Sequence, residues 1–177
     1  QVTVWMGPHL HVVQYPVRRG HWLNVVAIVQ GQVSGDVDDW DHETHSNDLQ
    51  DAMGATCSKL QDLISAIPNW RLWALCDRAP MTGAHQQAQG RVALLGDAAH
   101  PMRPYMAQGA GMAVEDAACL QQVLGQPDLA MDKRLERYAK LRWRRNARVQ
   151  ERSIRNGQIF HAKGLVRWGR DPSLSVL

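Results

Sequence analysis

The 177-residue sequence lacks any hydrophobic run long enough to cross a bilayer. Its longest apolar stretch, residues 22–29, is interrupted by Asn24 and falls far short of the roughly 20 residues that a spanning helix needs. The first residues show no basic segment ahead of an apolar run, so they do not resemble a secretory signal. The sequence therefore predicts no membrane partner and a place in the cytoplasm.

Cysteine and strong charge are also scarce. The three cysteines, Cys57, Cys76 and Cys119, form neither a CxxC pair nor a zinc spacing, which predicts reduced and mostly buried thiols. A net charge of +3 and a pI near 9.0 are only mildly basic, so composition predicts no nucleic-acid partner. No GxGxxG follows a predicted strand, so the turn that usually binds a dinucleotide's pyrophosphate is missing from this sequence.

The first half of the sequence has the pattern of an antiparallel meander followed by a helix. Apolar, β-branched runs alternate with Gly and Pro turns, which is typical of strands in such a sheet. Leucine, isoleucine and methionine then recur at helical spacing until Pro68. The predicted elements are strands at 2–6, 11–17, 22–29 and 71–76, loops at 31–46 and 78–89, and a single helix at 47–67.

The second half combines one compact apolar run with two helices. Residues 90–96 have the composition of a buried parallel strand. Helices are predicted at 111–124, ended by Gly125 and Pro127, and at 132–155, with an irregular tail from Gly164 onward. The predicted fold class is α+β.

The segment at residues 90–117, GRVALLGDAAHPMRPYMAQGAGMAVEDA, carries the clearest chemical signal. A strand would deliver Gly96 and Asp97 to its carboxyl end, where open α/β sheets bind their ligands. Gly109 and Gly111 precede a helix whose free N–H groups and dipole would face an electron-rich ligand atom. The plainer alternative is a strand–turn–helix connection in which the glycines serve the turn and Asp97 caps the helix.

This segment resembles, without gaps, the second flavin-binding motif of the aromatic-ring hydroxylases, the group that includes salicylate hydroxylase and 3-hydroxybenzoate 6-hydroxylase. The resemblance implies that FAD is the cofactor and that Asp97 bonds its ribityl chain, with Pro104 beside the isoalloxazine. It also implies that His100 and Pro101 shape the loop. The remaining cofactor contacts that it implies are Gly96 and, through the backbone at the pyrimidine edge, Gln108, Gly109, Ala110, Gly111 and Met112.

Similarity at residues 7–20, 23–25 and 73–80 extends the resemblance over most of 5–125, and a weaker similarity follows at 148–150, 156–157 and 160–161. The chain therefore resembles the C-terminal half of such an enzyme, and the expected fold is part of an α/β FAD-binding fold with an antiparallel-sheet substrate domain. The expected division is the C-terminal part of the substrate sheet at 1–80, the closing segment of the FAD domain at 81–125, and a helical region at 126–177.

His11 and Tyr15 lie four residues apart on a predicted strand and so face one side of it. The resemblance implies that both line the pocket for a small aromatic acid or phenol, with His11 as the base and Gln108 as the polar partner opposite. NADH or NADPH would reduce FAD, and a flavin hydroperoxide formed with O₂ would then hydroxylate the ring. The alternative is that His11 faces solvent and Tyr15 belongs to the core.

Two rival functions stay open on the sequence. His9, His11, Asp97 and His100 could assemble a metal-dependent hydrolase site, and the chain could also be a non-catalytic relative that has lost flavin. The basic character of the last helix predicts a solvated face or a homodimer contact. Its cations are Arg134, Arg137, Lys140, Arg142, Arg144, Arg145, Arg148, Arg152 and Arg155.

Overall fold

The structure is a computed structural model of the chain that describes residues 1–31, 42–162, 164–165 and 168. The chain divides into two compact units. Unit 1 comprises Gln1–Ala74 with Gln158–Leu177, and unit 2 comprises Leu75–Gly157. Each unit has its own cluster of buried apolar side chains. No helix in the described ranges is long and apolar enough to cross a membrane.

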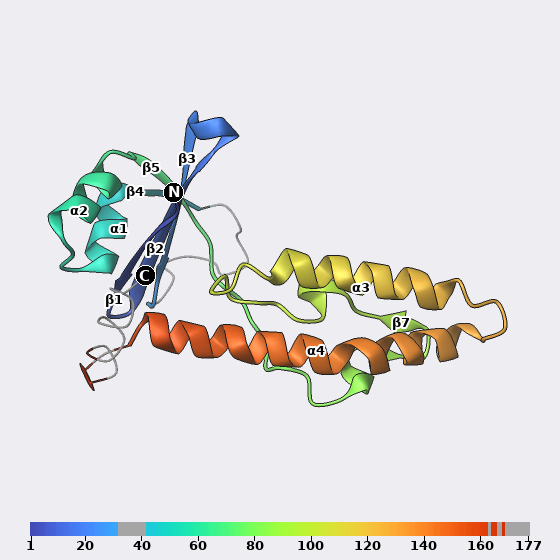
Figure 1. The fold of residues 1–177 in the computed structure, drawn as a ribbon. Helices are drawn as coiled ribbons and strands as arrows, with labels where there is room; N and C mark the ends of the chain where they lie inside the picture. Colours follow the sequence, from blue (N-terminus) through green and yellow to red (C-terminus); the bar gives the residue numbers. More distant parts are fainter. Residues whose placement is uncertain (32–41, 163, 166–167, 169–177) are drawn as a thin grey trace. The chain divides into compact units, whose positions relative to one another are not determined.

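Unit 1 contains the predicted meander. Strands β1 (Thr3–Gly7), β2 (Leu10–Val17) and β3 (Trp22–Val29) form an antiparallel sheet in the order β1-β2-β3 (Figure 1). The turn before β3 places Arg18, Arg19 and Gly20 at positive φ, and only Gly20 adopts that geometry without a steric cost. Leu10 and Val12 project from one face of β2 into a core with Met53, Leu60 and Ile64 of the helices described next.

Two short helices stand where the sequence predicts one. Helix α1 (Ser46–Met53) ends at Gly54, which has φ of 67° and ψ of −152°, and α2 (Ser58–Ser65) starts afresh after it. The single helix at 47–67 is therefore wrong, because the chain turns at a glycine whose geometry no helix contains. Each short helix still directs an apolar face at β2, as the periodicity predicts.

Of the loop predicted at 31–46, residues 32–41 lie outside the described residues. The prediction is wrong for residues 42–45. Residues His42–His45 form strand β4, which pairs antiparallel with β5 (Asn69–Leu72). The sequence His-Glu-Thr-His has no strand signal of its own. Its strand geometry comes from the backbone hydrogen bonds to β5, a tertiary effect that local propensity does not include.

Unit 2 begins with short elements: η2 (Ala84–Gln86), β6 (Ala88–Gln89), β7 (Val92–Ala93) and the single turn η3 (Gly96–Ala98). The predicted parallel strand at 90–96 is wrong for this chain. Only Val92–Ala93 is a strand, it pairs antiparallel with β6, and the Val92 side chain is 67% exposed. A buried parallel strand needs neighbours on both sides, and within the described part of the chain β6 is the neighbour it has.

Both predicted helices of the second half are confirmed. Helix α3 (Gly109–Leu124) and the first 27 residues of α4 (Met131–Phe160) lie side by side in unit 2, joined by the turn after Gly125 (Figure 1). Arg134 donates to the carbonyls of Leu124, Pro127 and Leu129 in that turn. The predicted irregular tail lies mostly outside the described residues, although Gly164, Leu165 and Trp168 are helical.

All three cysteines are unpaired, as the sequence predicts. They are not buried: Cys57 and Cys76 are exposed and Cys119 is intermediate. Cys57 stands at the N-cap of α2, a boundary position that faces solvent. The mixture of helices with antiparallel sheets confirms the α+β class.

Candidate functional site

The predicted flavin segment forms one continuous structure in unit 2, which we call the flavin loop and define as residues 94–108. It leaves β7, makes the η3 turn at Gly96 and Asp97, and runs without further regular structure to α3. Gly96 is buried with φ of +58°, and a Cβ there would lie 3.3 Å from the Ala113 Cβ. A glycine is therefore required both by the turn and by its close packing on α3.

Asp97, which is part of the η3 turn, lies beside the first residue of α3. Its Oδ1 is 3.9 Å from the position that a Cβ on Gly109 would occupy, and the residue is exposed. Gln108 is the N-cap of α3 and gives no side-chain cap, so within this described segment the N–H groups of Gly109, Ala110 and Gly111 have no acceptor from the helix. An exposed carboxylate thus stands beside uncapped donors at the positive end of a 16-residue helix.

This arrangement fits the flavin contacts that the sequence predicts. Asp97 can accept from hydroxyl groups, and the first turn of α3 can donate to an electron-rich ring edge. Pro104, Gln108, Ala110 and Gly111 are all exposed, and Gly109 is partly exposed. Because glycine has no side chain, the backbone at Gly109 and Gly111 is open to the close approach that a bound ring needs.

Met112 needs a correction as a donor. Its N–H already donates to the Gln108 carbonyl at 2.9 Å, and its side chain is buried at 1% exposure. The helical hydrogen-bond ladder begins at this residue, so the free N–H groups end at Gly111. Met112 instead packs inside unit 2, where its carbonyl accepts a bond from Arg142.

His11 is buried in unit 1 and not on a solvent face. It lies between Leu10 and Val12 on β2, so it projects to the side of the sheet opposite their core. Its Nδ1 is 2.9 Å from Nε2 of His161, and its ring meets Phe160 edge-on with centroids 5.5 Å apart. Burial, and secondarily the charge of His161, lower the pKa of His11 to about 4.

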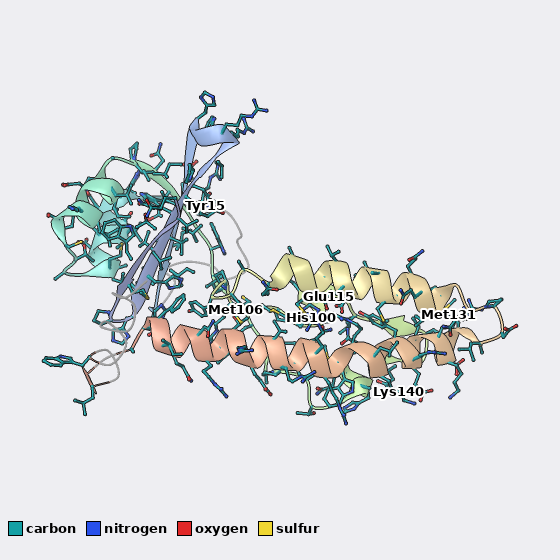
Figure 2. All side chains as sticks on the ribbon, in the orientation of Figure 1. Tyr15, His100, Met106, Glu115, Met131 and Lys140 are labelled. Atoms are coloured by element: carbon teal, nitrogen blue, oxygen red, sulfur yellow. The ribbon has the colours of Figure 1, made fainter. Side chains whose placement is uncertain are left out.

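Tyr15 differs from His11 in its surroundings. It pairs with Asn24 across β2 and β3, and its side chain is 37% exposed. Figure 2 labels Tyr15 on the sheet of unit 1. The alternative in which His11 faces solvent and Tyr15 is core is therefore wrong for both residues. The third predicted pocket residue, Gln108, belongs to unit 2.

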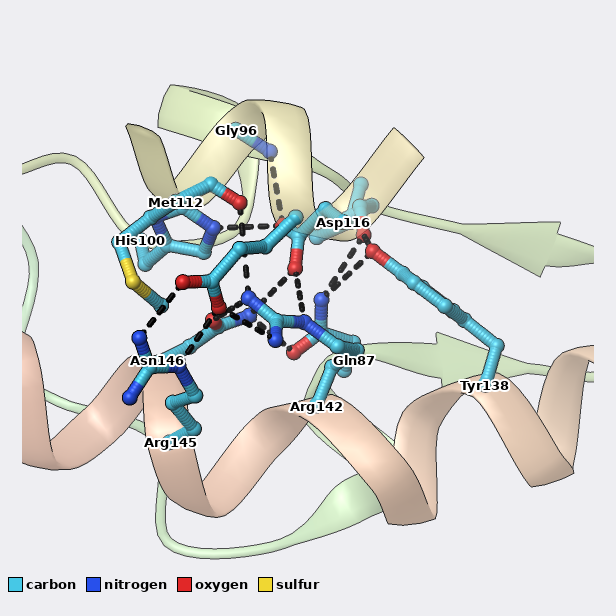
Figure 3. Close-up of polar contacts among 11 residues, drawn as sticks. Gln87, Gly96, His100, Met112, Asp116, Tyr138, Arg142, Arg145 and Asn146 are labelled. Carbon is cyan, nitrogen blue, oxygen red and sulfur yellow. Dashed lines mark hydrogen bonds and ion pairs between the residues drawn. The ribbon is translucent and has the colours of Figure 1, made fainter. Parts of the chain in front are cut away.

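A buried polar network behind the flavin loop escaped the sequence reasoning (Figure 3). At its centre the Asp116 carboxylate, which is 0% exposed, receives four hydrogen bonds. Burial tends to raise its pKa, but donors from His100, Arg142, Asn146 and Gly96 outweigh this and hold the pKa at about 2. Because a carboxylate only accepts, His100 donates from Nε2, at 2.6 Å.

The same network corrects the prediction of a solvated basic helix at one cation, Arg142. Most of the other cations are exposed, as predicted: Arg137, Lys140, Arg144, Arg145, Arg148, Arg152 and Arg155. Arg142 is 7% exposed and pairs with Asp116 at 2.7 Å and Glu115 at 2.8 Å. Arg145 also pairs with Glu115, from an exposed position. An acidic pair within the otherwise apolar residues 109–120 of α3 was the signal that could have revealed this, since a buried carboxylate requires a partner.

The metal-site alternative finds no support in the described residues, where no three His, Cys, Asp or Glu side chains gather. His9 pairs with Gln30, and His100 is fully buried against Asp116. His9 and His11 belong to unit 1, whereas Asp97 and His100 belong to unit 2.

Comparisons with known proteins agree with the flavin reading of this geometry. The family described as FAD binding domain matches residues 15–153. A 3-hydroxybenzoate 6-hydroxylase of Polaromonas naphthalenivorans is 38% identical over 170 residues, which cover 96% of this chain and 41% of the relative. A salicylate hydroxylase of Pseudomonas putida is 34% identical over 169 residues, covering 90% and 38%.

Two solved structures share the fold over nearly the whole chain. A salicylate hydroxylase substrate complex matches with a TM-score of 0.81 and 28% identity, covering 98% of this chain and 43% of that one. Klebsiella pneumoniae HpxO complexed with FAD and uric acid matches with a TM-score of 0.78 and 26% identity, covering 100% and 44%. The chain thus spans about two-fifths of the length of these relatives.

Proposed function

Because the chain belongs to the FAD binding domain family, whose match covers residues 15–153, we propose that the complete protein is an FAD-dependent monooxygenase that hydroxylates an aromatic acid or phenol. The observation that carries the proposal is Asp97 beside the uncapped start of α3. The similarity to hydroxylases of 3-hydroxybenzoate and salicylate supports the substrate class. NADH or NADPH and O₂ are the proposed co-substrates, and the cytoplasm is the proposed location.

In this proposal unit 2 supplies the contacts to the reactive end of FAD. Asp97 accepts from the ribityl hydroxyls, Pro104 borders the ring, and the first-turn N–H groups of Gly109, Ala110 and Gly111 hold the pyrimidine edge. When bound, FAD supplies hydride acceptance and oxygen activation. The positive end of α3 favours negative charge at the ring edge by about 0.3–1 kcal/mol, or more where the site is partly buried.

His11 is the proposed base for the substrate phenol, with Tyr15 and Gln108 as further pocket residues. A pKa of about 4 keeps its imidazole neutral, and so able to accept a proton, at any pH well above 4. A desolvated imidazolium is costly, so transfer is favoured only when the phenolate it creates stays close and compensates its charge. Changing His11 to Ala should slow hydroxylation by on the order of 10²–10⁴-fold while leaving FAD bound.

The division of the chain by role is part of the same proposal. Residues 1–80 supply part of the substrate sheet, 81–125 close the FAD site, and 126–177 add a helical region. The three unpaired cysteines agree with a reducing compartment.

The test of the proposal is FAD binding by Asp97→Ala in the complete protein. Losing the charge-assisted bonds of one carboxylate should weaken binding by roughly 1.5–3 kcal/mol, which is about a 10- to 150-fold rise in Kd. Asp128→Ala, an exposed carboxylate in the turn between α3 and α4, is the matched control. An Asp97→Ala protein that retains FAD as tightly as the control would refute the assigned site.

A further inference from the structure

The inward face of α4 carries a line of polar side chains, which is unusual for a buried helix face. Its members recur every three or four residues, so they share one side of the helix, and each is almost fully buried. Buried polar side chains destabilise a fold unless each is hydrogen-bonded. These residues are Tyr138, Arg142, Asn146, Gln150 and Ser153.

Three of these side chains donate to backbone carbonyls of the flavin loop. Tyr138 bonds the Leu94 carbonyl at 3.0 Å. Gln150 bonds the Pro101 carbonyl at 3.0 Å, and Ser153 bonds the Arg103 carbonyl at 2.7 Å. The order along α4 matches the order along the loop, so the helix and the loop run in a fixed parallel register.

The other two members reach the loop through Asp116. Arg142 Nε and Asn146 Nδ2 donate to its Oδ1 at 2.7 and 3.1 Å. Its Oδ2 accepts from the Gly96 N–H at 3.2 Å and from His100. One carboxylate therefore joins α4 on one oxygen to the turn that presents Asp97 on the other (Figure 3).

The loop needs such partners because it has few of its own. Between η3 and α3 the loop forms no helix or strand, so its backbone carbonyls need hydrogen-bond donors from outside the loop. Close contact continues at Gly157, where a Cβ would lie 2.8 Å from Cδ2 of Tyr105. The helix thus contacts the loop at points from Leu94 to Tyr105.

We infer that α4 is a template that sets the backbone conformation of the flavin loop, and that Asn146, Gln150 and Ser153 are positioning residues for Asp97 and Pro104. This inference rests on the proposed function, because it gives the loop's conformation a purpose in holding FAD. It assigns a role in cofactor binding to α4, a helix that contains none of the predicted cofactor-contacting residues.

The experiment compares Ser153→Ala with Arg152→Ala in the complete protein. Ser153→Ala removes one hydroxyl and little volume, whereas Arg152 is the exposed neighbour on the same helix. FAD is titrated into each apoprotein, and amide hydrogen exchange is measured over residues 96–105. Ser153→Ala should raise the Kd for FAD about three- to tenfold and speed exchange in the loop, whereas Arg152→Ala should change neither. Ser153→Thr, which keeps the hydroxyl, should bind FAD nearly as well as the wild type.

A double-mutant cycle separates positioning from general stability. If α4 acts through Asp97, the Ser153→Ala penalty on FAD binding should shrink in an Asp97→Ala background. An unchanged Kd, with only a lower melting temperature, would overturn the inference and leave the proposed function standing. Equal penalties in both backgrounds would also overturn the action through Asp97. A wild-type protein that binds no FAD would refute the proposed function and the inference together.

Discussion

Arg142 and Arg145 form ion pairs of almost equal length on the same helix, and they differ in burial. Arg142 Nε lies 2.7 Å from Asp116 Oδ1, with side chains 9% and 0% exposed. Arg145 Nη2 lies 2.6 Å from Glu115 Oε1, with side chains 50% and 38% exposed. Replacing each arginine by methionine removes the same charge and keeps most of the apolar stem. The comparison therefore contrasts a buried arginine with an exposed one on the same helix.

The expected losses differ several-fold. Arg142→Met leaves the buried Asp116 carboxylate without its cation, and breaking a buried pair in this way costs about 3–5 kcal/mol. Arg142 also donates to the partly exposed Glu115 and to the buried Asn146, so two further acceptors lose a donor. Arg145→Met breaks a pair that water and salt already screen, which costs about 0–1 kcal/mol.

The assay is urea denaturation of the two variants of the complete apoprotein, each compared with wild type at neutral pH. Arg142→Met should lose at least 2 kcal/mol more than Arg145→Met, roughly the difference between the two ranges above. Raising the salt concentration should reduce only the Arg145 effect, since buried pairs are screened far less. Losses that agree within 1 kcal/mol, a margin close to the error of extrapolated unfolding energies, would refute the assignment of a buried, stabilising network.

Three further predictions follow from the same geometry. Because the pKa of His11 falls from 6.5 to about 4 on folding, the folded state binds fewer protons than the unfolded state between these values. Stability should therefore decline as pH falls through this window, by up to about 3 kcal/mol, and His11→Gln should remove that decline in denaturation curves. Gly157→Ala should lower stability by about 1–3 kcal/mol, because the added methyl group overlaps the Tyr105 ring by more than the roughly 1 kcal/mol that Ala gains over Gly in a helix. Gln158→Ala is the control, and a Gly157→Ala protein that melts at a higher temperature than this control would contradict the prediction. The 177-residue chain alone should bind FAD poorly, since it has no glycine-rich phosphate turn, and micromolar binding by a calorimetric titration would show otherwise.

Elements whose boundaries are determined by nearby residues in the sequence were predicted well. The meander follows from β-branched runs separated by Gly and Pro, and the boundary between α3 and α4 follows from Gly125 and Pro127. Each of these signals depends on residues within one turn or strand. Local sterics and hydrogen bonding are enough to favour them.

Elements that depend on a distant partner were missed. Strand β4 exists because β5 pairs with it, and the antiparallel pairing of Val92–Ala93 depends on β6. The apolar composition of residues 90–96 indicates burial, yet Val92 and Leu95 are exposed in this chain. Composition indicates that a segment favours burial, but whether it is buried depends on the elements available to pack against it.

The site divides in the same way. Asp97 and the glycines at the start of α3 were found because their chemistry is local to one motif. The burial of His11 was not, because Phe160 and His161, about 150 positions later in the chain, create it. Arg142 and Asn146 were hidden in a basic helix, and the signal that could have indicated their buried partner was the acidic pair Glu115 and Asp116 in α3.

The most direct test of the central claim is to follow the oxygen atom during turnover of the complete protein. The protein is incubated with NADH or NADPH, ¹⁸O₂ and a panel of aromatic acids that includes salicylate and 3-hydroxybenzoate, and the products are analysed by mass spectrometry. A flavin-dependent monooxygenase should yield a hydroxylated product in which a single oxygen atom from ¹⁸O₂ is found on the ring, and only when FAD is present. Product whose new oxygen comes from water, or turnover that persists after FAD is removed, would contradict the account.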